Sequence, residues 1–241
     1  MKTKAFILRI NDPRSIEYAK HTADSCDKVG LDWEYFQGFQ NMHAQYAWGK
    51  TGIHITKSEG QERQFPSPDA IPPHVDNLPV GHIAECCSAG HASIWKKIAD
   101  SDLDIGIVLE HDALMLHNID TMTIPDKHIC VLGYKMTDPS RYNHENAGPP
   151  INALPLDGHE GAHAYAMTGN TARLLVKEIE VFGRLGCVDN AYFIRQQRKT
   201  QVPLCIANPT PAIGWLREST IWGKSAQVNY NFIPSFQENY K

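Results

Sequence analysis

Two carboxylates follow an apolar segment near the middle of the chain. Residues 104–109 (DIGIVL) have the composition of a buried strand, and Glu110, His111 and Asp112 come directly after it. In an extended chain alternate side chains point the same way, so Glu110 and Asp112 are expected to face one point. Open α/β sheets bind ligands at the carboxyl ends of their strands, and paired oxygen donors there suit Mg²⁺ or Mn²⁺ bridging to phosphate. The same spacing also fits an acidic turn that only ends a strand in water.

The segments before these carboxylates alternate between strand-like and helix-like patterns. Residues 4–10 (KAFILRI) form an apolar run typical of a buried strand, and Asp12 followed by Pro13 is a typical helix start. The helical spacing lasts until Gly30, and residues 33–36 predict the next strand. A strand, a helix and a second strand in this order are typical of a βαβ unit.

The rest of the chain continues this alternation. A helical stripe begins near Gly81, and another helix begins at Thr168 or Asn170. Further strands are expected at residues 104–109, 128–133, 162–167 and 202–206, and a short helix at 188–197. The order predicts an α/β protein with a mostly parallel central sheet.

One stretch, from about residue 40 to residue 80, breaks the alternation. It is rich in glycine and proline and has no clear hydrophobic period. Such a stretch is typically a functional loop, or else a solvated excursion without a role. We expect a single domain over residues 1–241 with this stretch as an irregular insertion.

The composition excludes several classes of protein. The chain has 241 residues, of which 42% are hydrophobic and 21% charged, as is typical of a globular protein. Its 23 basic and 27 acidic residues give a formal net charge of −4, which excludes a protein that wraps nucleic acid. The six cysteines have no CxxC spacing, and no apolar run reaches membrane-spanning length. We expect a cytoplasmic protein with free thiols, no membrane span and no nucleic-acid partner.

Several short motifs occur in a fixed order along the chain. The helix before the carboxylates carries CCSAGHASIW (86–95), and the strand after it continues into LEHD (109–112). These motifs resemble glycosyltransferase family 25, the lipopolysaccharide and collagen galactosyltransferase family, which combines a Ser-His-x-x-x-Trp-like helix element with a strand ending in Leu-Glu-Asp-Asp. The further matches are AFILRINDPR (5–14), VLG (131–133), GAHAY (161–165), VD (188–189) and ESTI (218–221). The resemblance covers most of the chain outside residues 40–80.

The resemblance implies a GT-A-type fold, an α/β/α sandwich that binds a nucleotide sugar at the carboxyl ends of its strands. It implies an inverting, metal-dependent transfer of a hexose, by family galactose from UDP-galactose, to a hydroxyl of a glycan or another acceptor. Mn²⁺ or Mg²⁺ would be held by Glu110 and Asp112, and Asn11 and Arg14 would lie near the nucleotide. Asp189 would act as the general base.

The same residues have simpler structural interpretations. Asn11 can be a turn residue, Arg14 can pair with a surface carboxylate, and Asp189 can cap the helix that follows it. Trp48, inside the irregular stretch, is either a sugar-stacking surface on the acceptor side or a hydrophobic anchor. These alternatives stay open at the level of sequence.

The remaining polar candidates lie close to the motifs. His91 is on the apolar stripe of its helix, so we expect a hydrogen-bonded core histidine rather than a ligand, and we expect Tyr165 to be a core residue. His159 and His163 flank Gly161, where each is either a contact for metal or substrate or a plain loop residue.

Two positions depart from the family pattern. His111 replaces the first aspartate of Leu-Glu-Asp-Asp, and Gly90 replaces the serine before the helix histidine. Since an extended chain would turn His111 away from Glu110 and Asp112, we expect it to support the site rather than to bind; Gly90 mainly affects the packing of the helix on the sheet. The histidine keeps two other functions open: a degenerate nucleotide-sugar-binding module without turnover, and a metal-dependent phosphohydrolase.

Overall fold

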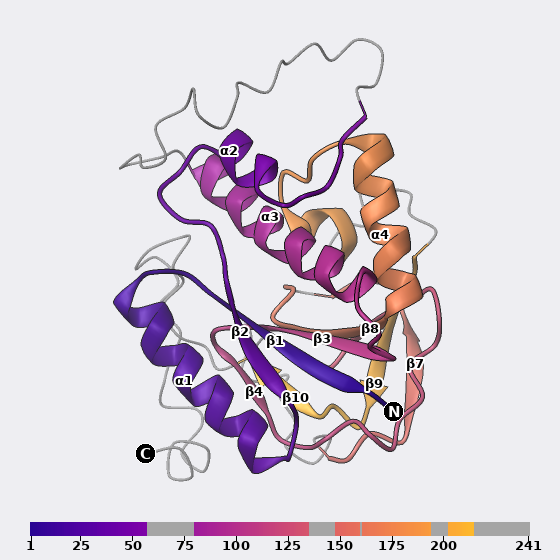
Figure 1. The fold of residues 1–241 in the computed structure, drawn as a ribbon. Helices are drawn as coiled ribbons and strands as arrows, with labels where there is room; N and C mark the ends of the chain where they lie inside the picture. Colours follow the sequence, from indigo (N-terminus) through magenta and orange to yellow (C-terminus); the bar gives the residue numbers. More distant parts are fainter. Residues whose placement is uncertain (57–79, 135–147, 160, 194–201, 215–241) are drawn as a thin grey trace.

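The computed structural model describes residues 1–56, 80–134, 148–159, 161–193 and 202–214, and its helices and strands alternate along the chain (Figure 1). The elements are β1 (Thr3–Arg9), α1 (Pro13–Lys28), β2 (Trp33–Gln37), α2 (Ala44–Gly49), α3 (Val80–Ala99), β3 (Ile105–Glu110), β4 (Ala113–Met115), β5 (Ile129–Val131), β6 (Gly133–Tyr134), β7 (Asn152–Leu156), β8 (Ala164–Thr168), α4 (Gly169–Phe182), the π-helical turn η4 (Asp189–Phe193), β9 (Leu204–Asn208) and β10 (Ala212–Gly214).

The central sheet has seven strands in the order β2-β1-β3-β8-β5-β9-β7. Strands β2, β1, β3, β5 and β9 run in one direction, and β8 and β7 run in the opposite direction. The sheet is therefore mixed but largely parallel. A small second sheet has the order β4-β10-β6.

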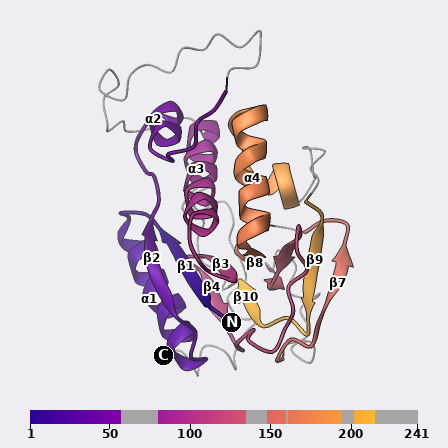
Figure 2. The ribbon, with the colours of Figure 1, turned by 45° about the vertical axis from the view of Figure 1, so that its right-hand side comes forward.

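Helices cover both faces of the central sheet (Figures 1 and 2). Helices α2, α3 and α4 pack on one face, in a core cluster that includes Phe6, Leu8 and Val108 of the strands. Helix α1 and the small sheet pack on the other face, in a cluster that includes Ile7 and Leu109. Neighbouring residues of β1 and β3 thus point to opposite faces, as the period of a strand requires. The result is the α/β/α sandwich expected from the sequence.

Local sequence signals explain where the first helix begins and ends. The Asp12 side chain accepts a hydrogen bond of 2.9 Å from the backbone N–H of Arg14, and Pro13 follows as the first helical residue. The chain leaves the helix through Gly30, whose φ of +70° is the left-handed conformation that glycine adopts easily. The predicted start and end of this helix are confirmed.

Helix α3 lies close to the strands at Gly90. A Cβ atom at this residue would lie 3.1 Å from Leu8 Cδ1, and the Cα of Gly38 would be 3.8 Å from it. A Cβ atom at Gly38 would meet the same Leu8 carbon at 2.9 Å. The absence of a side chain at both positions lets β1, α3 and the end of β2 approach one another.

The irregular stretch expected at about residues 40–80 is only partly described. It contains the short helix α2, and residues 57–79 lie outside the described part of the chain. Trp48 of α2 is 1% exposed and belongs to the core cluster that it shares with α3. It is therefore a hydrophobic anchor, and the sugar-stacking alternative for Trp48 is wrong. Among the described helices, none combines the length and the apolarity that a bilayer crossing needs.

Candidate functional site

Glu110 is the last residue of β3 and lies at the edge of the sheet where the parallel strands end. It is paired in register with Leu8, near the end of the parallel strand β1. Its carboxylate turns to the face covered by α3, where Oε1 lies 3.3 Å from His91 Nε2. The side chain of Glu110 is 20% exposed, whereas that of His91 is fully buried. Glu110 therefore joins a buried network to an edge that solvent and ligands can reach.

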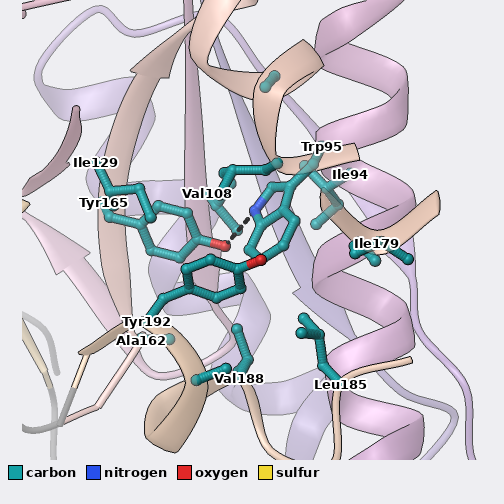
Figure 3. Close-up of a cluster of buried hydrophobic side chains, with 14 of the residues drawn as sticks. Ile94, Trp95, Val108, Ile129, Ala162, Tyr165, Ile179, Leu185, Val188 and Tyr192 are labelled. Atoms are coloured by element: carbon teal, nitrogen blue, oxygen red, sulfur yellow. Dashed lines mark hydrogen bonds between the residues drawn. The ribbon is translucent and has the colours of Figure 1, made fainter. Parts of the chain in front are cut away.

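A chain of buried polar groups lies behind this carboxylate. Trp95 Nε1 donates to the hydroxyl of Tyr165 at 2.8 Å, and this hydroxyl lies 2.7 Å from His91 Nδ1. Figure 3 shows the first of these bonds between α3 and β8, surrounded by apolar side chains. His91 is thus a hydrogen-bonded core histidine and Tyr165 a core residue, as the sequence predicted.

The helix supplies its part of this cluster by simple periodicity. Cys87, His91 and Trp95 are spaced four residues apart on α3, so they share one face of the helix. The sequence contained this signal, but only the fold shows that β3 and β8 place Glu110 and Tyr165 opposite that face. The contact between His91 and Glu110 was not foreseen from the sequence.

Tyr165 remains a neutral phenol in these surroundings. Burial raises the pKa of Tyr165 well above its ordinary value of 10, while the hydrogen bond from Trp95 opposes that change. The negative charges of Glu110 and Asp189 raise the pKa further. Both carboxylates therefore lie within electrostatic range of the buried Tyr165 hydroxyl.

Asp189 begins the π-helical turn η4 and is half-buried. The residues around it are anchored: Val188 is buried, and the Tyr192 ring lies edge-on to Trp95 with the centroids 5.4 Å apart (Figure 3). Tyr192 also donates a hydrogen bond of 3.0 Å to Glu178 Oε2. The expected helix at 188–197 is in fact this five-residue turn as far as it is described, and Asp189 is its first residue rather than a cap before it. A π-helical turn of this kind is frequent at functional sites.

The chain turns at His111 and Asp112 instead of staying extended. The argument that alternation makes Glu110 and Asp112 face one point therefore does not apply, because β3 ends at Glu110 and β4 begins at Ala113. His111 does lie on the face opposite to Glu110: its ring stacks on Tyr18 of α1 with the centroids 6.0 Å apart. This contact agrees with the supporting role expected for His111.

Asn11 and Arg14 follow β1 at the same edge of the sheet as Glu110. Asn11 is exposed in the bend between β1 and α1. The Arg14 guanidinium lies against Asp12, with distances of 3.2 Å from Nε to Oδ1 and 3.3 Å from Nη2 to Oδ2. The simpler interpretation of Arg14, a pair with a nearby carboxylate, therefore describes this structure, and the start of α1 lies beside it.

His159 and His163 form a pair next to Glu110. Their ring centroids are 5.6 Å apart, and both residues are buried. His159 Nδ1 lies 2.9 Å from the carbonyl oxygen of Gly161, which fixes the ring in the loop before β8. Both histidines are therefore buried beside the start of β8, and neither is a surface residue.

At the edge of the sheet where β3 ends, the carboxylates are the groups that suit a hard divalent cation. Glu110 and Asp112 offer the oxygen donors that Mn²⁺ and Mg²⁺ prefer. Among the described residues, one group of three possible ligands lies close together, with ligand atoms within 4.8 Å of one another: Cys87, His91 and Glu110. This group does not include Asp112, and its thiol and imidazole are softer donors better suited to zinc.

The fold and the site together define an α/β/α protein with Glu110 at the edge where such sheets bind nucleotides. The family model for glycosyltransferase family 25 (LPS biosynthesis protein) matches residues 6–191. This chain therefore belongs to glycosyltransferase family 25 and is a glycosyltransferase, as its motifs suggested.

Two solved structures of galactosyltransferases are similar in part. One is a Drosophila beta-1,4-galactosyltransferase 7 mutant in complex with manganese, UDP-Gal and xylobiose (TM-score 0.33, 9% identity, 73% of this chain and 52% of that chain). The other is the galactosyltransferase LgtC in complex with donor and acceptor sugar analogs (TM-score 0.36, 12% identity, 73% of this chain and 62% of that chain). The matched part thus spans about half to six tenths of these proteins. No curated protein sequence matches this chain.

Proposed function

We propose that this glycosyltransferase transfers a hexose, galactose from UDP-galactose, to an acceptor hydroxyl with inversion at the anomeric carbon. The observation that carries the proposal is the position of Glu110 at the end of β3, at the carboxyl edge of the sheet in a family 25 chain. The acceptor is a glycan or another hydroxyl-bearing molecule. Residues 1–241 act as one catalytic domain, and the stretch at 40–80 lies on the acceptor side.

Each side chain has a stated task in this reaction. Glu110 and Asp112 hold Mn²⁺ or Mg²⁺, which when bound neutralises charge on the diphosphate. Asn11 and Arg14 lie near the nucleotide, where the start of α1 and a guanidinium both favour an anion. Asp189 accepts the proton of the acceptor hydroxyl. The acceptor oxygen then bonds to the anomeric carbon on one face of the sugar, while the bond to UDP breaks on the other.

An assay of UDP release with and without acceptor tests this proposal. The purified chain is incubated with UDP-galactose, UDP-glucose or UDP-N-acetylglucosamine, Mn²⁺ or Mg²⁺, and a panel of glycosides. UDP release from UDP-galactose that requires both the metal and an acceptor is the expected result, and NMR of the product at the anomeric carbon reports inversion. A matched Glu110→Gln variant should lose this activity, because its amide is a poor ligand for a hard cation.

The assay also separates the two other functions. Release that does not need an acceptor would identify a hydrolase that uses water. Binding of the nucleotide sugar with no release, tested by calorimetry on the same samples, would identify a binding module in which His111 has ended turnover. Acceptor-dependent release from another sugar nucleotide would support transferase activity and overturn the choice of galactose.

A further inference from the structure

We propose that His91 is a positioning residue for Glu110, with its imidazole held in a single tautomer by Tyr165 and Trp95. This inference deepens the proposed function, because it takes the Glu110 carboxylate to be part of the donor site. The tautomer that the network selects presents the Nε2 hydrogen of His91 to Glu110 Oε1. His91 touches neither metal nor sugar in this account and acts only through Glu110.

The direction of the network follows from counting hydrogens. The indole of Trp95 can only donate, so the Tyr165 oxygen accepts this bond. The phenol has one hydrogen of its own, and the second partner of its hydroxyl among the described residues is His91 Nδ1 at 2.7 Å. If Tyr165 donates to Nδ1, the neutral imidazole carries its hydrogen on Nε2, which lies 3.3 Å from the carboxylate. Each polar hydrogen in the network from Trp95 to Glu110 then has an acceptor.

The other neutral tautomer satisfies fewer groups. With the hydrogen on Nδ1, the Nε2 lone pair would face the carboxylate oxygen of Glu110, and the two would repel. In the same tautomer Nδ1 would donate to Tyr165, and the phenol hydrogen would be left without an acceptor among the described residues. Of the two neutral tautomers, the one with its hydrogen on Nε2 therefore satisfies the whole network.

The same count argues against a soft metal ion held by Cys87, His91 and Glu110, although their ligand atoms lie within 4.8 Å. A metal on Nε2 would force the hydrogen onto Nδ1, which would then compete with the phenol hydrogen. As a metal ligand, His91 would have to give up the hydrogen bond from Tyr165 that orients its ring. Metal-bound histidines instead usually donate their second N–H to a group that can only accept. The geometry favours a hydrogen bond to Glu110 over a bond to metal.

The tautomer is measured first, on the ligand-free protein. Two-bond ¹⁵N–¹H correlation spectra of histidine-labelled protein distinguish protonated from unprotonated ring nitrogens, and the His91→Gln variant assigns the His91 signals. We expect an unprotonated Nδ1 and a protonated Nε2. In Tyr165→Phe, which keeps the ring and removes the hydroxyl, this preference should be lost. An unprotonated Nε2, as in the Nδ1–H tautomer, in the wild type would overturn the proposal.

The positioning role is then measured through UDP and Mn²⁺. His91→Met removes the donor to Glu110 and keeps an apolar side chain of similar length, and loss of such a supporting partner typically weakens metal affinity or activity about 10–100-fold. His91→Gln, whose amide can again donate towards Glu110, should recover most of the loss. Ser88→Ala is the control on α3, because the buried Ser88 hydroxyl donates at 2.9 Å to the carbonyl of Ala84, within the helix itself. Thermal unfolding of each variant reports on the fold.

The outcomes separate this proposal from the proposed function. If the wild type does not bind UDP with Mn²⁺, the proposed donor site fails. If the wild type binds and His91→Met binds equally well, the donor site stands and the positioning role is wrong. A Co²⁺ titration tests the metal alternative: a thiolate charge-transfer band that disappears in Cys87→Ala, with Co²⁺ affinity that also falls in His91→Gln, would make His91 a ligand and overturn the proposal, and we expect no such band.

Discussion

The backbone N–H of Glu110 donates a hydrogen bond of 2.8 Å to the carbonyl oxygen of His163. This bond exists because β8 runs antiparallel to β3, with Leu109 paired to Ala164, so the start of β8 lies at the edge where β3 ends. The loop with His159 and His163 is thereby tied to the main chain of a proposed metal ligand. A change in the conformation of that loop is therefore expected to shift the position of Glu110.

The first prediction concerns Asp112 as a metal ligand. Asp112→Asn keeps the size of the side chain and removes its charge, so Mn²⁺-dependent binding of UDP should weaken about 10–100-fold with the fold intact. Calorimetric titration of UDP with and without Mn²⁺ measures this effect, and circular dichroism checks the fold. Unchanged affinity with the Mn²⁺ dependence preserved would remove Asp112 from the ligand set.

The second prediction concerns Asp189 as the general base. Asp189→Asn keeps the shape but cannot accept a proton, so transfer should be lost while UDP and Mn²⁺ still bind. Single-turnover rates and UDP titrations on the same preparation separate the two effects. Near-normal turnover would leave Asp189 as a structural or acceptor-binding residue, and Glu160 and Glu218, which lie outside the described residues, would be the next bases to test.

The third prediction concerns Trp48. Because this side chain is buried against α3, Trp48→Ala should reduce the free energy of unfolding by about 3–5 kcal/mol, and Trp48→Phe by less. Denaturant unfolding measures both values. UDP affinity of the folded fraction should not change; a selective loss of acceptor binding at full stability would restore the sugar-stacking interpretation.

The fourth prediction concerns Asp12, the cap of α1. Burial acts to raise the pKa of Asp12, but hydrogen bonds from Arg14 outweigh it and hold the pKa below its ordinary value of 3.8. The ionised carboxylate therefore stabilises the fold above the unfolded-state pKa, and this contribution is lost as the pH falls through the lower folded-state pKa. Asp12→Ala should cost about 1 kcal/mol near neutral pH, and Asp12→Asn less, since asparagine also caps helices.

Urea unfolding at several pH values checks this prediction. The difference in stability between wild type and Asp12→Asn should shrink as the pH falls through the acidic range, because the wild-type carboxyl group then becomes neutral like the amide. A difference that does not vary with pH would mean that the charge of Asp12 contributes nothing to the cap.

Local signals allowed the sequence to predict much of this fold. The cap, the proline and the terminating glycine of helix α1 all lie in the helix or directly beside it. The apolar run of β3 likewise marks the edge of the sheet where Glu110 lies. These features depend on neighbours in sequence, so no tertiary information is needed to find them. The family motifs added the expected roles of Asp189 and Arg14.

Other features depend on contacts between distant segments. The direction of β8 is not encoded in its own five residues. The turn after Glu110 depends on α1, where Thr22 Oγ1 donates a hydrogen bond of 2.8 Å to the His111 carbonyl. The pair between His91 and Glu110 likewise requires α3 to be docked on the sheet. The alternation argument failed at Asp112 for this reason: it assumed an extended chain where a distant helix stabilises a turn.

The shared approach of Gly38 and Gly90 to Leu8 has a consequence for sequence variation. A methyl group at either glycine would meet the same Leu8 carbon, so the first substitution would force Leu8 into another rotamer and the second would then cost less. The effects of Gly38→Ala and Gly90→Ser on stability should therefore be non-additive in a double-mutant cycle. A smaller residue at position 8 should tolerate a serine at position 90 better than leucine does, which predicts that these two positions vary together in the family.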